Sequence, residues 1–234
     1  MRQLGKLALR GWLLPHADDA SDKRDRGQVP VVAGSRKIPG TALLASSAEH
    51  LAQCAAQSSA ARIGPGLLDG EASCRFVTDL LTRLTHVPVI LDALAMDVVL
   101  QALHLAKPVP RTRHAGEMAH PSGRTKDDVV ADAPALIQDM ARKHNAFIAL
   151  EGATTFIASP ESAAWQHVSS TAGLGTSGSG DVLAGTMTGL TAQRASLERA
   201  SAWGVVLHAL AGKKLAERHD RLGFLAHEIP EEIP

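Results

Sequence analysis

Short apolar runs alternate along the chain with longer stretches in which apolar and polar residues are mixed. The apolar runs predict strands, and they read VPVVAGS (29–35), ARIG (61–64), PVILDAL (88–94), AFIALEG (146–152) and TTFIASP (154–160). The mixed stretches predict helices over residues 41–57, 72–85, 134–144, 181–193 and 197–219. Strands that alternate with helices predict an α/β layered domain with a mainly parallel sheet.

A glycine-rich run, GTSGSGDVLAGTMTGL (175–190), opens the predicted helix 181–193. Backbone N–H groups of such a turn can point together at an anion, and the following helix adds partial positive charge. Asp181 then has two interpretations, as an N-cap of the helix or as a base beside a bound phosphate. The density of glycines from Gly175 to Asp181 favours the second. The carboxyl ends of the parallel strands are where such a ligand is expected.

Composition narrows the classes of partner. Of 234 residues, 45% are apolar, and Lys plus Arg equal Asp plus Glu at 24 each, which disfavours a nucleic-acid or membrane partner. No apolar run reaches the roughly 20 residues that span a bilayer, and residues 1–15 do not read as a signal peptide, so we expect a cytoplasmic protein. Cys54 and Cys74 are expected to be buried thiols rather than a disulfide.

Several segments, taken in order, resemble the ADP-dependent NAD(P)H-hydrate dehydratases. They are DKRDRGQVPVVAGSRKIPGTALLA (22–45), IGPGLLD (63–69), RTRHAGEMA (111–119), LEGATTFIASP (150–160), GTSGSGDVLAGTMTGLTAQ (175–193) and WGVVLHALAGKKLAE (203–217). The resemblance implies a ribokinase-like three-layer αβα sandwich, with residues 1–234 as a single domain and residues 1–20 as a candidate flexible segment. It also implies a homo-oligomer, often a tetramer, in this family.

The implied reaction is the repair of hydrated NADH or NADPH. The hydroxyl of the hydrate is phosphorylated from ADP or ATP, with Mg²⁺ expected, and phosphate then leaves. The resemblance makes Asp181 the base, and Gly178 and Gly180 the anion hole. It assigns the nucleotide to Glu151, Gly152, Ala153, Thr154, Thr155 and Gly180, and the hydrated substrate to Thr41, Gly66, His114 and Asp181. Glu117 is a candidate for supporting the site, and no protein ligand set for a metal is legible.

The sequence departs from the family pattern at three places. Glu151 stands where the family has a lysine, and Leu94 stands where it has a second aspartate. The interval from Leu44 to Gly64 is shorter than in the family. Glu151 either points at the nucleotide phosphates and weakens binding, or points away. The alternatives to a dehydratase are therefore a ribokinase-like small-molecule kinase and a nucleotide-binding relic without activity.

Overall fold

The computed structural model describes residues 1–15, 27–34, 48–67, 70–96, 109–114, 125–162, 164–169 and 171–234. Its strands are β1 (Arg2–Gln3), β2 (Val31–Val32), β3 (Ala61–Ile63), β4 (Val89–Leu91), β5 (Val109–His114), β6 (Ala146–Glu151), β7 (Thr154–Ala158) and β8 (Trp165–Val168). Its helices are α1 (Lys6–Leu9), α2 (Ala48–Ala55), α3 (Gly70–Arg83), α6 (Lys126–Ala131), α7 (Ala133–His144), α8 (Ser179–Ala192) and α9 (Leu197–His219). Short 3-10 helices are η2 (Ala93–Met96), η3 (Ala172–Gly175) and η4 (Ala226–Glu232).

The described strands form one sheet of eight, in the order β1-β8-β7-β6-β5-β4-β3-β2. From β2 through β6 every neighbouring pair is parallel, and β1 is parallel to β8. Only β7 runs against its neighbours, because Gly152 and Ala153 connect β6 to β7 as a tight hairpin. The mainly parallel sheet expected from the sequence is confirmed.

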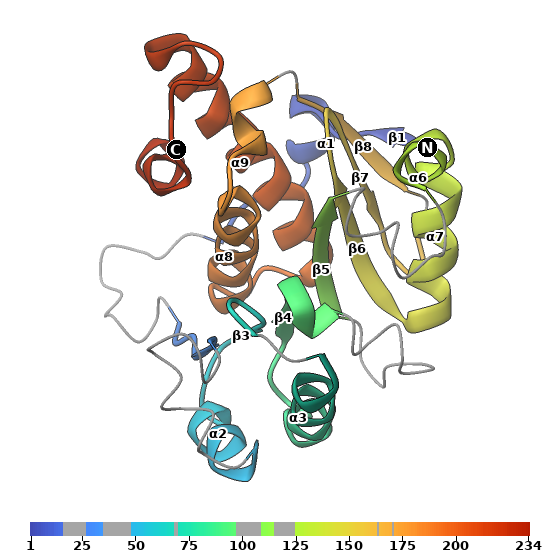
Figure 1. Cartoon of the computed structure of the whole chain (residues 1–234), viewed down its shortest axis with the longest axis vertical. Helices are drawn as coiled ribbons and strands as arrows, with labels where there is room; N and C mark the ends of the chain where they lie inside the picture. The colour runs from blue at the N-terminus through green and yellow to red at the C-terminus, as the bar shows by residue number, and fades with distance from the viewer. Residues whose placement is uncertain are drawn as a thin grey trace.

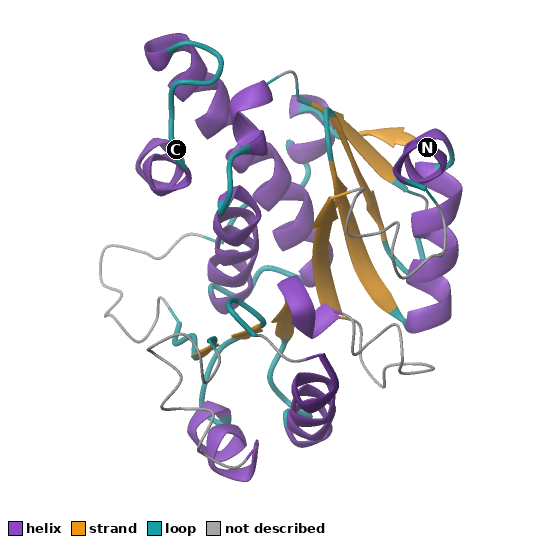
Figure 2. Ribbon diagram, viewed as in Figure 1, coloured by secondary structure: helices purple, strands orange, loops and turns teal. Residues whose placement is uncertain are grey.

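Helices cover both faces of this sheet (Figure 1). Alternate residues of β6 separate the two layers: Ile148 packs with α7, whereas Ala149 packs with α8 and α9. In the same way Leu91 of β4 joins the cluster of α2 and α3, and Ile90 faces Ala184 of α8. The result is a three-layer αβα sandwich, which agrees with the predicted fold class (Figure 2).

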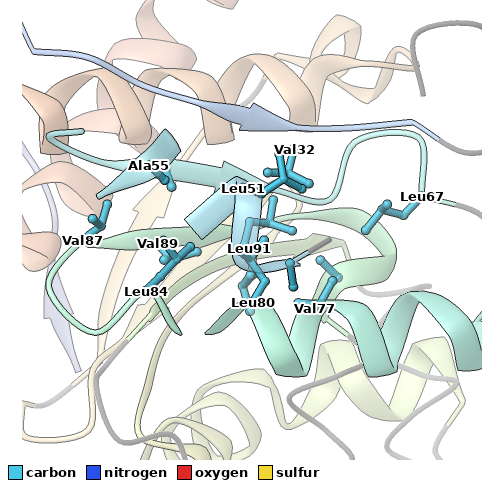
Figure 3. Close-up of a cluster of buried hydrophobic side chains, with 14 of the residues drawn as sticks. Val32, Leu51, Ala55, Leu67, Val77, Leu80, Leu84, Val87, Val89 and Leu91 are labelled. Carbon is cyan, nitrogen blue, oxygen red and sulfur yellow. The ribbon is translucent and has the colours of Figure 1, made fainter. Parts of the chain in front are cut away.

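The core beneath α2 and α3 is aliphatic. Leu80, Val77 and Leu84 of the α3 region meet Val89 and Leu91 of β4, and all of them are buried. Figure 3 shows these side chains converging with residues of α2 and β2. Because β3 and β4 carry apolar side chains toward this layer, their opposite faces are left for α8.

Some local expectations need correction. His114 is the last residue of β5, in a segment where the apolar pattern predicts no strand. Cys54 is exposed on α2, while Cys74 is buried as expected, and the two cysteines form no disulfide. The predicted helix 41–57 is described only from Ala48 to Ala55.

The N-terminal residues contact the far edge of the sheet. Arg2 and Gln3 pair with β8, and Leu4 and Leu9 are buried against the α8 and α9 layer. Nitrogen Nε1 of Trp203 donates to the carbonyl oxygen of Trp12 at 2.7 Å. Residues 1–15 therefore add a strand and a patch of core to the sandwich.

Gly64 follows β3 and has a φ of +141°, in the region that favours glycine. A Cβ at this position would overlap the backbone carbonyl oxygen of Asp92, at the end of β4. The strands approach this closely because Asp92 N–H donates to the carbonyl of Ile63 at 3.0 Å. Only a residue without a side chain fits between the two strand ends.

We predict that Gly64→Ala lowers the free energy of unfolding by more than about 1 kcal/mol, because it adds both backbone strain and overlap. Urea denaturation measures this change. Gly189→Ala in α8 is the matched control: a Cβ there meets no atom within 4 Å, and alanine favours a helix interior by roughly 0.5 kcal/mol. Equal effects of the two variants would contradict the prediction.

Candidate functional site

The carboxyl ends of β3, β4 and β6 meet the first turn of α8, and the candidate site lies at this junction. Asp92 follows β4, Glu151 ends β6, and Asp181 lies in the first turn of α8. The register of the parallel strands places the backbone of His114 beside that of Glu151. These residues therefore lie at the edge of the sheet where the sequence predicts a ligand site.

Asp181 is bound by an arginine that projects from β3. Nitrogen Nη2 of Arg62 donates to Oδ1 of Asp181 at 2.6 Å and also to Oδ2 of Asp92. The side chains of Arg62 and Asp92 are 11% and 9% exposed, whereas that of Asp181 is 53% exposed. Arg62 thus lies below Asp181, and Asp181 faces the solvent.

The structure excludes one of the two interpretations of Asp181, the N-cap. The N-cap of α8 is Gly178, which has a φ of +88°, and no side chain caps the helix there. Asp181 lies three positions later, and its carboxylate binds Arg62. It is therefore not a capping residue.

Burial acts on Asp92 against its ionised form. Removal from solvent raises the pKa of this carboxyl above its ordinary value, while the Arg62 hydrogen bond and charge oppose the rise and the Asp181 charge adds to it. The backbone N–H of Ala93 donates to Oδ1 at 2.8 Å. The ionised form of the buried Asp92 therefore depends on Arg62 more than that of the exposed Asp181 does.

The glycine-rich run presents backbone donors beside Asp181. The N–H groups in the first turn of a helix have no partner within that helix. Ser179 N–H donates to Thr176 at 3.2 Å, whereas the N–H groups of Gly180 and Asp181 have no hydrogen bond among the described residues. Such groups can bind an oxyanion.

The run is held from below by a buried histidine. Oγ of Ser179 and Nε2 of His208, on α9, share a hydrogen bond of 3.0 Å. Ser179 is 2% exposed and His208 is 5% exposed. Burial lowers the pKa of His208 to about 4, so the imidazole is neutral near pH 7.

Glu151 faces the glycine-rich run. A Cβ built on Gly180 would lie 3.6 Å from Oε1 of Glu151 and 4.0 Å from Oε2. The carboxylate is therefore beside the first turn of α8, where the helix dipole favours a negative charge. Gly152 and Ala153 form the hairpin turn after Glu151, and Thr154 and Thr155 begin β7.

The remaining predicted residues are placed unevenly. Gly66 is exposed in the turn after β3, with a φ of +70°. His114 is placed by its backbone, at the carboxyl end of β5. Thr41 and Glu117 lie outside the described residues.

Sequence reasoning missed Arg62 and the pair of Ser179 and His208. Arg62 could have been noticed as a charged residue inside the apolar run ARIG. No sequence signal links Ser179 to His208, because the two residues come from different helices. His208 looks like any packed helix residue in the pattern of α9.

The fold and the site together define an α/β protein of the three-layer αβα class, with the glycine-rich N-terminus of a helix at the strand ends. A sequence profile of the NAD(P)H-hydrate dehydratase family matches residues 47–234. The chain belongs to this family.

Two relatives match over nearly their whole length. The ADP-dependent (S)-NAD(P)H-hydrate dehydratase of Xanthomonas campestris is 34% identical, covering 100% of this chain and 95% of the relative. The protein of the same name from Neisseria meningitidis is 31% identical, covering 97% and 91%. The Xanthomonas alignment runs over 279 positions against the 234 residues of this chain, so the relative has residues that this chain lacks.

Solved structures agree with the fold. The ADP/ATP-dependent NAD(P)H-hydrate dehydratase of Bacillus subtilis, co-crystallized with ATP and Mg²⁺, has a TM-score of 0.80 at 24% identity, covering 100% of this chain and 96% of that one. A ribokinase-like superfamily protein of Enterococcus faecalis has a TM-score of 0.81 at 22% identity, covering 100% and 94%. Within the described ranges, no helix is long and apolar enough to cross a membrane.

We predict that His208 makes the stability of the protein depend on pH. Its pKa falls from 6.5 in the unfolded chain to about 4 in the folded one, so the unfolded state takes up the proton first. Stability is therefore full above about pH 6.5 and declines toward about pH 4. Between about pH 7.5 and pH 5 this group should remove about 2 kcal/mol.

The measurement is urea denaturation of the wild type and of His208→Gln at both pH values. Glutamine does not titrate, so the variant should lose about 2 kcal/mol less than the wild type on acidification. Parallel losses in the two proteins would show that His208 does not take up the proton on unfolding. A variant that is unstable at both pH values still gives this difference.

Proposed function

We propose that the chain is an ADP-dependent (S)-NAD(P)H-hydrate dehydratase, which returns hydrated NADH or NADPH to the reduced cofactor. The observation that carries the proposal is the position of Asp181. Its exposed carboxylate lies at the start of α8, beside backbone N–H groups that have no hydrogen-bond partner in the described part of the chain. The full-length likeness to relatives of that name supports it. Asp181 is the proposed base, and Gly178 and Gly180 the proposed anion hole.

The proposed chemistry has two balanced steps. In the first, Asp181 takes the proton of the hydrate hydroxyl while the hydroxyl oxygen bonds to the terminal phosphorus of ADP and the bond to AMP breaks. The backbone N–H groups of the glycine-rich run neutralise charge on the phosphoryl oxygens. In the second, the carbon–oxygen bond breaks and phosphate leaves with the electron pair. The neighbouring carbon gives its proton to water, and the electrons of that carbon–hydrogen bond form the double bond.

The hairpin after Glu151 is the proposed site of the nucleotide phosphates, with Gly152, Ala153, Thr154 and Thr155. Its two-residue turn exposes backbone groups next to the first turn of α8. Gly66 lies in the turn after β3 and His114 ends β5, on either side of β4 in the sheet. Both are proposed contacts of the hydrated nicotinamide. Thr41 is proposed from the resemblance alone.

Mg²⁺ is proposed as a partner of the nucleotide phosphates. Across the part of the chain that is described, no three His, Cys, Asp or Glu side chains gather as a metal site. Mg²⁺ is commonly held by substrate phosphates with few protein ligands. The lack of such a cluster among these residues is therefore compatible with an Mg²⁺ ion bound mainly through the nucleotide. A homo-oligomer, the tetramer and a cytoplasmic location also stay predictions.

We predict that Asp181→Asn lowers kcat by at least about 100-fold, because asparagine keeps the shape of the side chain and cannot accept the proton. The assay follows reappearance of NADH or NADPH absorbance from the hydrate with ADP and Mg²⁺. Asp139→Asn, at an exposed position of α7, removes the same charge far from the junction and should keep the wild-type rate. An Asp181→Asn protein as active as the wild type would refute the proposed base.

Product analysis separates this proposal from a small-molecule kinase. A kinase leaves a stable phosphorylated product, whereas the dehydratase releases phosphate together with the reduced cofactor. A relic without activity would give neither product, and calorimetry with ADP would then report whether the nucleotide still binds.

A separate prediction concerns Glu151, whose carboxylate lies beside Gly180. Two unit charges about 4 Å apart interact by several kcal/mol at an effective dielectric of about 20, and solvent reduces this further. Glu151→Lys should therefore tighten ADP binding by at least about 10-fold, equivalent to about 1.4 kcal/mol. Isothermal calorimetry measures the change.

Glu161→Lys is the matched control, because Glu161 is exposed in the connection between β7 and β8. It changes the net charge equally and should leave the affinity for ADP within about 2-fold. Weaker ADP binding by Glu151→Lys at saturating Mg²⁺ would mean that the carboxylate helps to hold the nucleotide with its ion.

A further inference from the structure

Arg62 is a charged residue inside the sheet whose contacts converge on the candidate base. It lies in the middle of β3 and its guanidinium reaches the layer of α8. One nitrogen, Nη2, serves both Asp92 and Asp181. The ion pair with Asp92 is buried, and the ion pair with Asp181 joins this buried group to a half-exposed one.

The guanidinium is placed by packing as well as by charge. The second terminal nitrogen, Nη1, lies against the backbone of Gly185, one turn after Asp181, at 3.6 Å from a Cβ built there. Nitrogen Nε is buried and has no hydrogen-bond partner among the described residues. An unsatisfied buried donor costs free energy. The position of the Arg62 side chain is therefore not explained by hydrogen bonds to all of its nitrogens.

The contact with Arg62 uses one carboxylate oxygen of Asp181, the proposed base, and does not involve the other oxygen. Oδ1 of Asp181 accepts from Arg62, whereas Oδ2 has no hydrogen bond within the described ranges. A base must bring an oxygen within about 2.6–3.2 Å of the proton that it removes. A carboxylate fixed through Oδ1 presents Oδ2 in one direction, which reduces the freedom that catalysis must otherwise remove.

We propose that Arg62 is a positioning residue that orients Asp181 for proton removal. The proposal rests on the proposed function of Asp181 as the base. Arg62 does not itself reach the substrate, since its side chain is only 11% exposed beneath Asp181. The competing explanation is that Arg62 only neutralises the buried Asp92.

A double variant separates these two roles. Arg62→Met alone leaves Asp92 buried without its cation, which destabilises the fold. Arg62→Met combined with Asp92→Leu replaces the buried pair by apolar side chains and should restore the urea midpoint of the wild type. It should still show kcat lowered by roughly 100-fold, with KM and the calorimetric Kd for ADP changed less than about 3-fold.

The control is Arg75→Met, which removes an exposed i,i+4 ion pair on α3 and should change neither kcat nor the midpoint. A stable double variant with wild-type kcat would overturn the proposal, because neutralising Asp92 would then be the whole role of Arg62. If the double variant does not fold, the proposal is tested by chemical rescue of the activity of Arg62→Ala with added guanidinium. Guanidinium at millimolar concentration should raise kcat toward the wild-type value.

Urea at the same concentration is the control for the rescue, since it has a similar shape and no charge. Equal effects of urea and guanidinium would also overturn the proposal. The contact itself is tested without any turnover by a double-mutant cycle of Arg62→Met and Asp181→Asn in the Asp92→Leu background. The shifts in urea midpoint should be non-additive, and additive shifts would overturn the assigned contact.

These arms distinguish the failure of this proposal from the failure of the proposed function. A wild-type protein that restores no NADH or NADPH from the hydrate rejects the function, and the double-mutant cycle still decides the contact. An active wild type with an unaffected double variant rejects the positioning role alone.

Discussion

The candidate site depends on the close packing of α8 between the sheet and α9. Ala184 is fully buried against Ile90 of β4, and Gly185 leaves room beside the guanidinium of Arg62. On the other side, a Cβ at Gly204 of α9 would come within 2.7 Å of Cγ of Met187. Small residues on both sides therefore let α8 approach near enough for its first turn to meet the strand ends. Asp92, Glu151 and Asp181 all lie where the first turn of α8 meets the strand ends.

The glycine-rich run is defined by the same packing. Gly178 adopts a φ of +88° so that the chain can turn into α8, and a Cβ there would press on Ala226 of η4 at 3.2 Å. Ser179 is tied to α9 through His208. The backbone donors of Gly180 and Asp181 are thus fixed before any ligand arrives, as electrostatic stabilisation of a charged transition state requires.

The sequence was sufficient for the elements with a compact or strongly periodic pattern. Strands β4, β6 and β7 and helices α7, α8 and α9 lie where the apolar pattern predicted them. Strand β5 was missed because VPRTRH carries arginines and reads as polar, although it lies between β4 and β6 in the sheet. The predicted shortening between Leu44 and Gly64 is not located by the structure, because residues 35–47 are outside the described part. Its location stays a prediction.

The candidate site was likewise predicted only in part from the sequence. Asp181 and its glycines are adjacent in the chain, so the sequence alone predicts that they act together. The contact of Arg62 with Asp92 and Asp181 joins β3, the end of β4 and α8, and no spacing along the chain encodes it. Sequence alone also left open where the side chain of Glu151 points. The register of β6 places it on the side of α8: Ala149 faces α8 and α9, so Glu151, two residues on, faces the same side.

The charges at this end of the sheet bear on how the proposed nucleotide would be held. Asp92, Asp181 and Glu151 bring three carboxylates to one end of the sheet, and Arg62 is committed to the first two. The guanidinium lies behind Asp181, with its side chain only 11% exposed. Attraction for phosphates from the described residues therefore comes from the backbone N–H groups and the dipole of α8, opposed by Glu151. A nucleotide that carries Mg²⁺ arrives with part of its charge neutralised, and this lowers its repulsion from Glu151 without requiring a lysine at that position.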